Sequence, residues 1–550
     1  MDIPRSATGV EKLSCVQQEY LADAQDANNQ EHELTLLQAI KVYPKAVGWS
    51  LVLSTTLIME GYDTKLVNSL FAQPAFQEAY GNLQPDGSYE ISAPWQTGLM
   101  NGTTVGQIVG LLIAGYISER FGFRKTMITA LIVTICFIFL QFFATGLIML
   151  EVAQILLGIP LGMFQTVCTV YAVEVSPVCL RGYLTTYANM CWVFGQITAS
   201  GVLRGVLDMP GPWAYRIPFA IQWAWPIPLI IGIYLAPESP WWLVRRNRLE
   251  EAKAAVTRLM IASNVSFDAD KSVALMVITT EHEREEGAGT SYLACFQGTD
   301  LRRTIIVIAC YCIQILCGNG FRDYSTYFFQ QAGLPTEQSF NMSIVAYALG
   351  IVGVLLAWFM IPHIGRRTLY LWGLTWILAI FVGIGGLGVP AISTGLAWGI
   401  GGLLLLSVFI YDATVGPVAY SLVSEIPSSL LRSKSVVLAR ISYNVLNIIN
   451  NSIVPYQLNP SAWNWGAKSG FFWAGSTLLA LAFTYFCIPE TKDRTTVEMD
   501  LLVAYKGAEI YTALYGWLLN MTFLFTKPTA RLKRLLGAIS RLPVARTKDP

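Results

Sequence analysis

The segment EVSPVCLR at residues 174–181 returns as EIPSSLLR at residues 425–432, 251 residues further along the chain. In both copies an arginine follows a glutamate by seven positions. Two more pairs recur at nearly the same separation, PESP (237–240) with PETK (489–492) and GFRK (122–125) with GRR (365–367). Chance does not align three such pairs, so we expect an internal duplication with two structurally equivalent halves.

Composition places the chain in a membrane. Of its 550 residues, 54% are hydrophobic and only 13% are charged, and the mean hydropathy is +0.48. These values predict an all-α membrane protein with many spans and exclude an ordinary soluble globule. A net charge of +1 without a basic patch indicates no nucleic-acid partner.

Apolar stretches of about 20 residues, the length that a helix needs to cross a bilayer, predict twelve transmembrane helices. Six are expected at residues 46–70, 95–118, 126–147, 150–173, 183–206 and 215–236, and six at 304–329, 339–361, 368–389, 394–420, 433–455 and 466–488. The expected domains are an N-terminal half (46–236), a linker with short helices (237–303) and a C-terminal half (304–488), between tails at 1–45 and 489–550. Two such halves with a site between them are typical of transporters that work by alternating access.

Basic residues predict the orientation, because short loops rich in Lys and Arg stay in the cytoplasm. Arg120, Arg124 and Lys125 follow the second span, Arg181 follows the fourth, and nine basic residues lie in 237–303. By contrast, the loop 72–94 contains acidic residues but no Lys or Arg, as an outside loop can. We therefore expect both termini in the cytoplasm.

No feature of the chain indicates an enzyme. It lacks a nucleotide loop of the G-x-x-x-x-G-K-[ST] type, so transport would run on gradients rather than on ATP. Its histidines, His32, His282 and His363, do not have the spacing of a metal site. We expect neither a metal nor a cofactor.

Two carboxylates lie inside the first span, in EGYDT at residues 60–64. A charge near the bilayer centre is costly, so it is retained mainly where it faces a cavity, a partner or an ion path. Glu60 and Asp63 are three residues apart and are expected on one helix face. We expect both to exchange protons, with Arg440 in the eleventh span as a positive partner from the other half. A fixed structural ion pair is the alternative, and Asp412 in the tenth span has the same two interpretations.

The segments GYISERFGFRK (115–125), PESP (237–240) and PET (489–491) carry a resemblance to the sugar-porter branch of the major facilitator superfamily, over about residues 40–500. Within that branch the chain looks most like the fungal maltose and other α-glucoside permeases, which are proton symporters. That likeness rests on EGYDT (60–64), YLTTY (183–187), PESPWWL (237–243), SEIPSS (424–429) and WNWGAKSGFFW (463–473). It implies the twelve-helix major facilitator fold and proton-coupled uptake of a sugar such as maltose.

Amide and aromatic side chains are expected to form the sugar site, since their hydrogen bonds and ring faces suit a neutral polyol. The resemblance implies that Gln314, in QILCG at 314–318, matches the first glutamine of the porter QQ-x-x-G signature. It also implies that Asp63 matches the aspartate of proton-linked porters. Further candidates are Gln196, Tyr420, Asn444 and Asn447. The alternative is that these polar groups hold helices together.

Charged residues at the inner helix ends are expected to form a latch across the inner gate. These latch residues are Glu119, Arg120, Arg124, Glu174, Arg181, Glu238, Arg366, Arg367, Glu425, Arg432 and Glu490. Exposed ion pairs are worth only about 0–1 kcal/mol each, so several that break together suit a reversible switch. Their alternative role is to mark orientation and cap helices. Arg322 and Asp323 in the seventh span are expected to form an outer-gate pair, although recognition of a charged substrate would use the same residues.

Three departures from the resemblance leave proton coupling and substrate open, and one of them is Arg322-Asp323, where the α-glucoside permeases look apolar. Gln107 stands where the α-glucoside permeases have a glutamate, and Gln154 stands where general sugar porters have an arginine. An exporter or importer of a sugar-like secondary metabolite and a transporter-like sugar sensor are the alternatives. We expect a monomer in the plasma membrane. No motif ranks one sugar over another, because a single hydroxyl changes the fit of a pocket without changing any motif.

Overall fold

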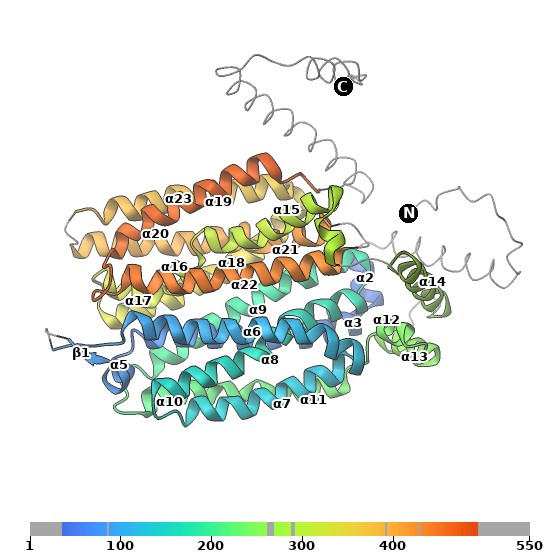
Figure 1. Ribbon diagram of the computed structural model, residues 1–550, viewed down its shortest axis with the longest axis horizontal. Helices are drawn as coiled ribbons and strands as arrows, with labels where there is room; N and C mark the ends of the chain where they lie inside the picture. The colour runs from blue at the N-terminus through green and yellow to red at the C-terminus, as the bar shows by residue number, and fades with distance from the viewer. Residues whose placement is uncertain are drawn as a thin grey trace, which may run out of the picture. The chain divides into compact units, whose positions relative to one another are not determined.

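The computed structural model describes residues 36–84, 87–260, 269–287, 292–390, 393–427 and 431–492. Nearly all of these residues are helical (Figure 1). The chain divides into two units, residues 1–493 and 494–550, and every described residue belongs to the first. The predicted C-terminal tail therefore lies almost entirely outside the described residues.

The N-terminal half contains the first six predicted spans. The first consists of α3 (Pro44–Ser54) and α4 (Thr56–Leu70), preceded by α2 (Leu36–Val42). Four long helices follow, α6 (Ala93–Phe121), α7 (Phe123–Phe142), α8 (Leu147–Val175) and α9 (Val178–Gly205). The sixth span is divided into α10 (Trp213–Ile221), the 3-10 turn η1 (Gln222–Ala224) and α11 (Pro226–Leu235). Between α4 and α6 lie α5 (Pro74–Tyr80) and a small antiparallel hairpin of β1 (Asn82–Leu83) and β2 (Tyr89–Glu90), in which Asn82 is opposite Glu90.

The linker and the C-terminal half follow the same plan. The linker holds α12 (Pro240–Arg245), α13 (Leu249–Leu259), α14 (Ala269–Gly287) and the 3-10 turn η2 (Tyr292–Phe296). The seventh span consists of α15 (Gly298–Leu316), α16 (Asn319–Asp323) and α17 (Ser325–Gln331), and it begins earlier than the predicted residue 304. The remaining spans are α18 (Thr336–His363), α19 (Arg366–Leu387), α20 (Thr394–Ala413) with α21 (Val415–Glu425), α22 (Arg432–Leu458), and α23 (Ser469–Cys487) after the 3-10 turn η3 (Gly466–Lys468).

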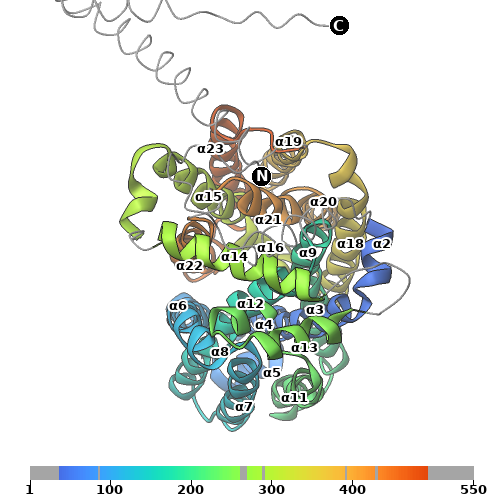
Figure 2. The same ribbon diagram turned by 90° about the vertical axis from the view of Figure 1, so that its right-hand side faces the viewer.

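The helix bundle has two distinct ends. The helices α12, α13 and α14 lie at one end, which we call the linker end, and α5, β1, α10 and α17 lie at the other, which we call the α5 end (Figure 1). Figure 2 views the bundle from the linker end, with α6, α7 and α8 in the lower half and α15, α19 and α23 in the upper half. The two halves meet where α6 packs against α22 and where α9 packs against α18.

Three of the predicted spans are not recognised by the length and hydropathy of their helices. Nine helical stretches of the described residues are long and apolar enough to cross a membrane, and α4, α9 and α22 are not among them. The helix α4 carries Glu60, Asp63 and Lys65, yet 13 of its 15 residues are buried. A polar helix is tolerated at membrane depth where it faces the interior of a bundle rather than lipid. The most polar spans therefore mark the functional interior.

Two spans are interrupted rather than continuous. Gly318, with a φ of +80°, separates α15 from α16 in the seventh span. Thr414 separates α20 from α21 in the tenth span, and its hydroxyl donates to the carbonyl of Ile410 at 2.6 Å. Irregular backbone within a membrane is tolerated only where it is buried in protein or lines a cavity. These breaks therefore point to the same interior.

Small residues allow α6 and α8 to pack closely. A Cβ added to Gly106 of α6 would lie 2.1 Å from the carbonyl oxygen of Ile155, and one added to Gly158 of α8 would lie 2.2 Å from the carbonyl oxygen of Thr103. Close approach of backbones through small residues is a principal source of helix association in membranes. This contact fixes two walls of the N-terminal half.

We predict that Gly106→Ala destabilises the protein, because the added methyl group forces α6 and α8 apart. The expected loss is about 1–3 kcal/mol, the usual cost of overpacking, seen as a lower melting temperature of the detergent-solubilised protein. The matched control is Gly115→Ala in the same helix, where an added Cβ meets nothing within 4 Å. Equal melting temperatures for the two variants would contradict the packing argument.

Candidate functional site

A cavity lies between the two halves. It contains about 1100 Å³ of space not occupied by protein atoms, including the part open to solvent. Side chains from both halves line it, and those that carry the argument below are Glu60, Gln107, Gln165, Trp192, Gln196, Gln314, Asn319, Arg322, Asp323, Asp412, Arg440 and Asn447.

The carboxylate of Glu60 is held by side chains from three other helices. Its Oε1 accepts hydrogen bonds from Gln107 Nε2 of α6 at 3.1 Å and from Gln165 Nε2 of α8. Its Oε2 accepts from the indole N–H of Trp192 of α9 at 2.9 Å. Glu60 is only 6% exposed. A buried carboxylate is tolerated when its oxygens are hydrogen-bonded in this way.

The glycine in EGYDT explains how Trp192 reaches Glu60. A Cβ added to Gly61 would lie 2.3 Å from the carbonyl oxygen of Trp192. The absence of a side chain at residue 61 therefore lets α4 lie directly against α9. This close approach places the indole beside the neighbouring carboxylate.

Arg440 connects this carboxylate to the C-terminal half. Its Nε donates to Gln165 Oε1 at 2.9 Å, so Gln165 bridges Arg440 and Glu60. Its guanidinium carbon lies 5.0 Å from the ring centroid of Trp192, 5.4 Å from that of Tyr311 and 4.7 Å from that of Tyr443. Such cation–π contacts stabilise a buried cation. We call Glu60, Gln107, Gln165, Trp192 and Arg440 the Glu60 cluster.

One donor group of Arg440 is buried without a partner among the described residues. The residue is 8% exposed, and its Nη1 has no hydrogen-bond partner in the described part of the chain. A buried donor without a partner is costly, and a ligand hydroxyl in the cavity would satisfy it. Sequence reasoning found Glu60 and Arg440 but missed Gln165 and Trp192, because an amide and an indole are common in membrane helices.

The predicted sugar-binding residues divide into two groups. Gln196, Gln314 and Asn447 line the cavity, and Gln314 Nε2 also donates to the carbonyl of Gly416 at 3.1 Å. Tyr420 and Asn444 are buried and are not part of the cavity wall. The ring centroid of Tyr420 lies 6.2 Å from that of Trp192 and 5.8 Å from that of Tyr311, so Tyr420 supports the aromatic rings around Arg440.

Asp63 lies apart from Glu60 and outside the cavity wall. It is fully buried, and its Oδ1 accepts from Gln141 Nε2 of α7 at 3.1 Å and from Gln222 Nε2 of η1 at 3.1 Å. Its Oδ2 has no partner among the described residues. A spacing of three residues places the carboxylates of Glu60 and Asp63 near one face of α4. Their hydrogen-bond partners nevertheless lie on different neighbouring helices. Gln154 is likewise behind the wall, where its Oε1 accepts from the hydroxyl of Thr103 at 2.5 Å.

The opposite wall of the cavity carries a second group of charges. Arg322 donates from Nη1 to the carbonyl of Cys317 at 2.8 Å, and its guanidinium lies 4.1 Å from the ring centroid of Tyr411. Asp323 accepts from Asn319 Nδ2 at 2.9 Å. Asp412, at the break between α20 and α21, accepts from Asn189 Nδ2 of α9 at 3.4 Å. Arg322 and Asp323 therefore lie on the cavity, and the described contacts of Arg322 are in its own half.

Comparison with known proteins identifies the family to which the chain belongs. Residues 49–502 match the family model described as "Sugar (and other) transporter". The chain belongs to this family. A general alpha-glucoside permease of Saccharomyces cerevisiae is 44% identical over 485 residues, which cover 87% of this chain and 79% of the relative. The maltose permease MAL61 of Saccharomyces cerevisiae is 42% identical over 490 residues, 88% of this chain and 80% of the relative.

Solved structures with a similar fold include the proton:xylose symporter XylE, a major facilitator superfamily protein. Its structure bound to 6-bromo-6-deoxy-D-glucose has a TM-score of 0.67 at 21% identity and covers 84% of this chain and 99% of the other. A partially occluded, inward-open form of the xylose transporter XylE from E. coli also has a TM-score of 0.67. This likeness confirms the predicted major facilitator fold of this sugar transporter. The family is one of membrane carriers, so the prediction that the chain is not an enzyme is confirmed as well.

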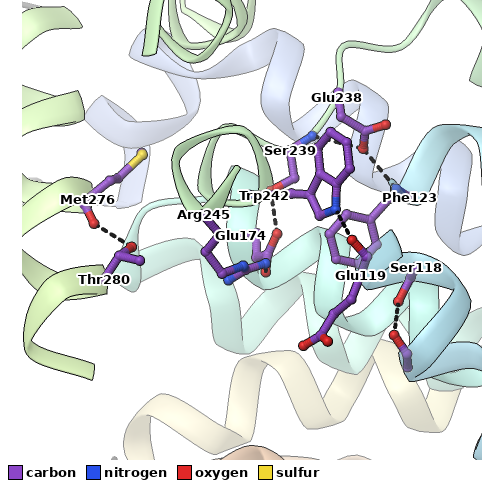
Figure 3. A network of polar contacts seen from close by, with 11 residues as sticks. Ser118, Glu119, Phe123, Glu174, Glu238, Ser239, Trp242, Arg245, Met276 and Thr280 are labelled. Carbon is purple, nitrogen blue, oxygen red and sulfur yellow. Dashed lines mark hydrogen bonds and ion pairs between the residues drawn. The ribbon is translucent and has the colours of Figure 1, made fainter. Parts of the chain in front are cut away.

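At the linker end of the transporter, the repeated motifs cap corresponding helices. The carboxylate of Glu238 accepts from the backbone N–H of Phe123 at 2.9 Å and of Arg124 at 3.3 Å, at the start of α7 (Figure 3). The carboxylate of Glu490 accepts from the backbone N–H of Arg367 at 3.4 Å, at the start of α19. Each carboxylate neutralises the positive end of a helix dipole. The duplication in the sequence is thus a duplicated helix cap.

Burial of Glu238 raises its pKa, because the surrounding protein disfavours the charged form. The backbone N–H groups of Ser239, Arg124 and Phe123 act in the opposite direction by stabilising the carboxylate. A Cβ on the glycine before either cap would collide with the carboxylate, at 2.5 Å for Gly122 and 2.2 Å for Gly365. The repeated glycines therefore leave room for the repeated glutamates.

The other latch residues make contacts within one half or with the adjoining linker. Glu174 pairs with Arg245 at 2.6 Å and accepts from Ser239 (Figure 3), and Arg366 pairs with Glu425 at 3.3 Å. The carbonyl of Glu119 accepts from Trp242 Nε1 at 2.8 Å. Arg124 lies over the ring of Tyr234, Arg120 donates to Tyr116, and Arg367 donates to the carbonyl of Tyr485. The side chains of Arg181 and Arg432 lie outside the described residues, so a latch between the halves stays a prediction.

At the α5 end, polar contacts cross between the halves. Ser69 of α4 bonds to Thr326 of α17 at 3.1 Å, and Asn101 of α6 donates to Ser452 of α22 at 3.0 Å. Asn459 Nδ2 donates to the carbonyl of Ile91 at 3.1 Å, and Arg204 Nε of α9 donates to Asn341 Oδ1 of α18 at 3.0 Å. These bonds join the two halves at the α5 end in this conformation.

We predict that Glu238→Ala and Glu490→Ala lower stability by similar amounts, because each removes the cap of an equivalent helix. The expected loss is about 1 kcal/mol for each, in the range of helix caps. Thermal unfolding in detergent measures it, with Glu281→Ala on the exposed face of α14 as the control. If both variants melt at the temperature of this control, the capping role is wrong.

Proposed function

We propose that this protein is a proton-coupled transporter that takes up an α-glucoside, such as maltose, by alternating access. One observation carries the proposal: the cavity between the halves is lined by amides and aromatic rings around a buried carboxylate and a buried guanidinium. The relatives from Saccharomyces cerevisiae, named as α-glucoside and maltose permeases, support the choice of substrate class. The two six-helix halves, 46–236 and 304–488, are the moving bodies.

Gln196, Gln314 and Asn447 are the proposed hydrogen-bonding partners of the sugar. Their amides can both donate and accept, as a neutral polyol requires. Arg440 Nη1, which has no partner among the described residues, supplies a further donor from the cavity wall. Tyr420 and Asn444 act from behind the wall, Tyr420 by holding the rings of Trp192 and Tyr311 in place.

Glu60 and Asp63 are the proposed proton-carrying groups. Glu60 is on the cavity wall and is connected to Arg440 through Gln165, so its charge is linked to the half that must move. Protonation of Glu60 would weaken its attraction to Arg440 and change the balance between the two conformations. Asp63, with glutamine partners on α7 and η1, links proton binding to the interior of the N-terminal half.

The linker end is the proposed cytoplasmic side, and the α5 end is the proposed outside, in the plasma membrane. The basic residues near α6, α8 and the linker support this orientation. The latch residues would close the cytoplasmic gate in the opposite conformation. The cavity would open to the cytoplasm while the α5 end is closed, and to the outside while the latch is formed. These two conformations give alternating access. We propose a monomer, since both halves of the cavity come from one chain.

A second candidate function has one observation in its favour. Arg322, Asp323 and Asp412 place charges on the C-terminal wall of the cavity, where a neutral sugar does not need them. A sugar-like secondary metabolite with a charged group, imported or exported, would use these side chains. A transporter-like sugar sensor would bind in the cavity without net flux.

The direct test is external alkalinisation in sugar-transport-null yeast that express this chain. Maltose, sucrose, trehalose, glucose and several glycosides are pulsed in turn. We expect the medium to become more alkaline with an α-glucoside, because each sugar enters with a proton. No pH change with any sugar, from a protein shown to reach the cell surface, would contradict the proposal.

We predict that Asp63→Asn abolishes accumulation against a gradient but retains counterflow of labelled sugar. Exchange needs the binding pocket, whereas accumulation needs a carboxylate that binds and releases a proton. Both modes are measured on the same cells. A variant that still accumulates sugar as the parent does would remove Asp63 from the coupling mechanism.

A further inference from the structure

Lys65 is a third charge in the first span, and neither sugar binding nor proton coupling uses it. It follows EGYDT directly and is 1% exposed. Its Nζ donates to the backbone carbonyl of Asp323 at 3.1 Å and to the hydroxyl of Ser325 at 2.9 Å. The same nitrogen lies 5.0 Å from the ring centroid of Tyr347. Lys65 belongs to the N-terminal half, whereas all three partners belong to the C-terminal half.

The two hydrogen-bond partners of Lys65 lie at a second break in the seventh span, at Tyr324 between α16 and α17. Asp323 is the last residue of α16, and Ser325 is the first residue of α17. The last carbonyls of a helix have no partner within it, and a cation there also interacts favourably with the helix dipole. Lys65 therefore satisfies a backbone group that the break exposes. The segment it holds also carries Asn319 and Arg322 onto the cavity wall.

The ammonium of Lys65 is stable when it is bonded to its partners or when it is hydrated, and it is unstable in between. A buried cation without partners is very costly. If the halves separate at the α5 end, Lys65 loses its three partners together, because all of them move with the other half. An ammonium is compact and strongly hydrated, so water that enters the opened end replaces them. The bonded and hydrated positions are thus two discrete states of one residue.

We infer that Lys65 is a positioning residue of the transport cycle: its ammonium holds the break between α16 and α17 against α4 while the α5 end is closed, and it leaves that site each time this end opens. This inference rests on the proposed function, because it assumes alternating access. Arg322 does not serve this purpose, since its donors contact Cys317 and its guanidinium lies over Tyr411, both in its own half. Lys65, rather than Arg322, is the cation that joins the halves at this break.

A labelling experiment tests the inference without requiring transport. Ser69 is fully buried at the α5 end, one turn of α4 beyond Lys65, so the reporter Ser69→Cys reacts with a water-soluble maleimide only when that end opens. The purified protein is labelled in nanodiscs, and the rate constant is read by mass spectrometry of the peptide that contains residue 69. Three variants are compared with the reporter alone: Lys65→Met, Ser325→Ala and, as control, Arg204→Gln.

We expect Lys65→Met to raise the labelling rate about tenfold or more, since hydrogen bonds to a charged group shift an equilibrium by at least this factor. Ser325→Ala should raise it less, because the carbonyl of Asp323 remains as an acceptor. Arg204→Gln removes two cross-half contacts at the same end, a hydrogen bond to Asn341 and a pair with Glu337, but the side chain of Arg204 is itself 26% exposed and that of Glu337 58% exposed, so water can replace both contacts. Exposed pairs are worth little, so the control should change the rate by less than about threefold.

Two results would overturn the inference. One is a labelling rate in Lys65→Met equal to that of the reporter alone, with Ser325→Ala also unchanged. The other is an equal rise in the Arg204→Gln control, which would mean that any contact at the α5 end has this effect. If the expected labelling rates appear but neither the parent nor any variant transports sugar, the proposed function is wrong. The role of Lys65 in the opening of the α5 end then stands.

Discussion

A carboxylate buried at membrane depth must be hydrogen-bonded, and the interior of this protein is arranged around that requirement at Glu60. Its partners Gln107, Gln165 and Trp192 come from α6, α8 and α9, so one side chain ties together four helices of the N-terminal half. Gln165 in turn accepts a hydrogen bond from Arg440 of α22. The protonation state of Glu60 therefore affects contacts in both halves, which is the physical condition for coupling a proton to a conformational change.

The same cluster explains why the polar helices lie where they do. The helices α4, α9 and α22 are not among the described helices that are long and apolar enough to be recognised as membrane spans, and each contributes a member of the Glu60 cluster. Apolar helices such as α7, α11 and α23 surround them and face outward. The cost of placing charges in a membrane is thus limited by enclosing them in protein. The breaks at Gly318 and Thr414 place irregular backbone along the same enclosed cavity.

The sequence predicted the fold well, because hydrophobic periodicity and the 251-residue repeat depend on local composition. It also identified Glu60, Arg440, Gln314 and Asn447, which line the cavity. It did not distinguish Glu60 from Asp63, since helix spacing gives a shared face but not which neighbouring helix each side chain meets. Tyr420 and Asn444 were chosen by residue type, and packing places them behind the wall. Lys65 was the clearest missed signal, a lysine two positions after Asp63 in a span.

Accumulation of labelled maltose in proteoliposomes under an imposed pH gradient, acidic outside, tests the central claim most directly. The account predicts concentrative uptake that collapses when a protonophore removes the gradient, and only equilibration when Glu60→Gln replaces the parent. Uptake that reaches the same level with and without the gradient would contradict it, because a buried carboxylate linked to Arg440 would then have no part in moving the sugar.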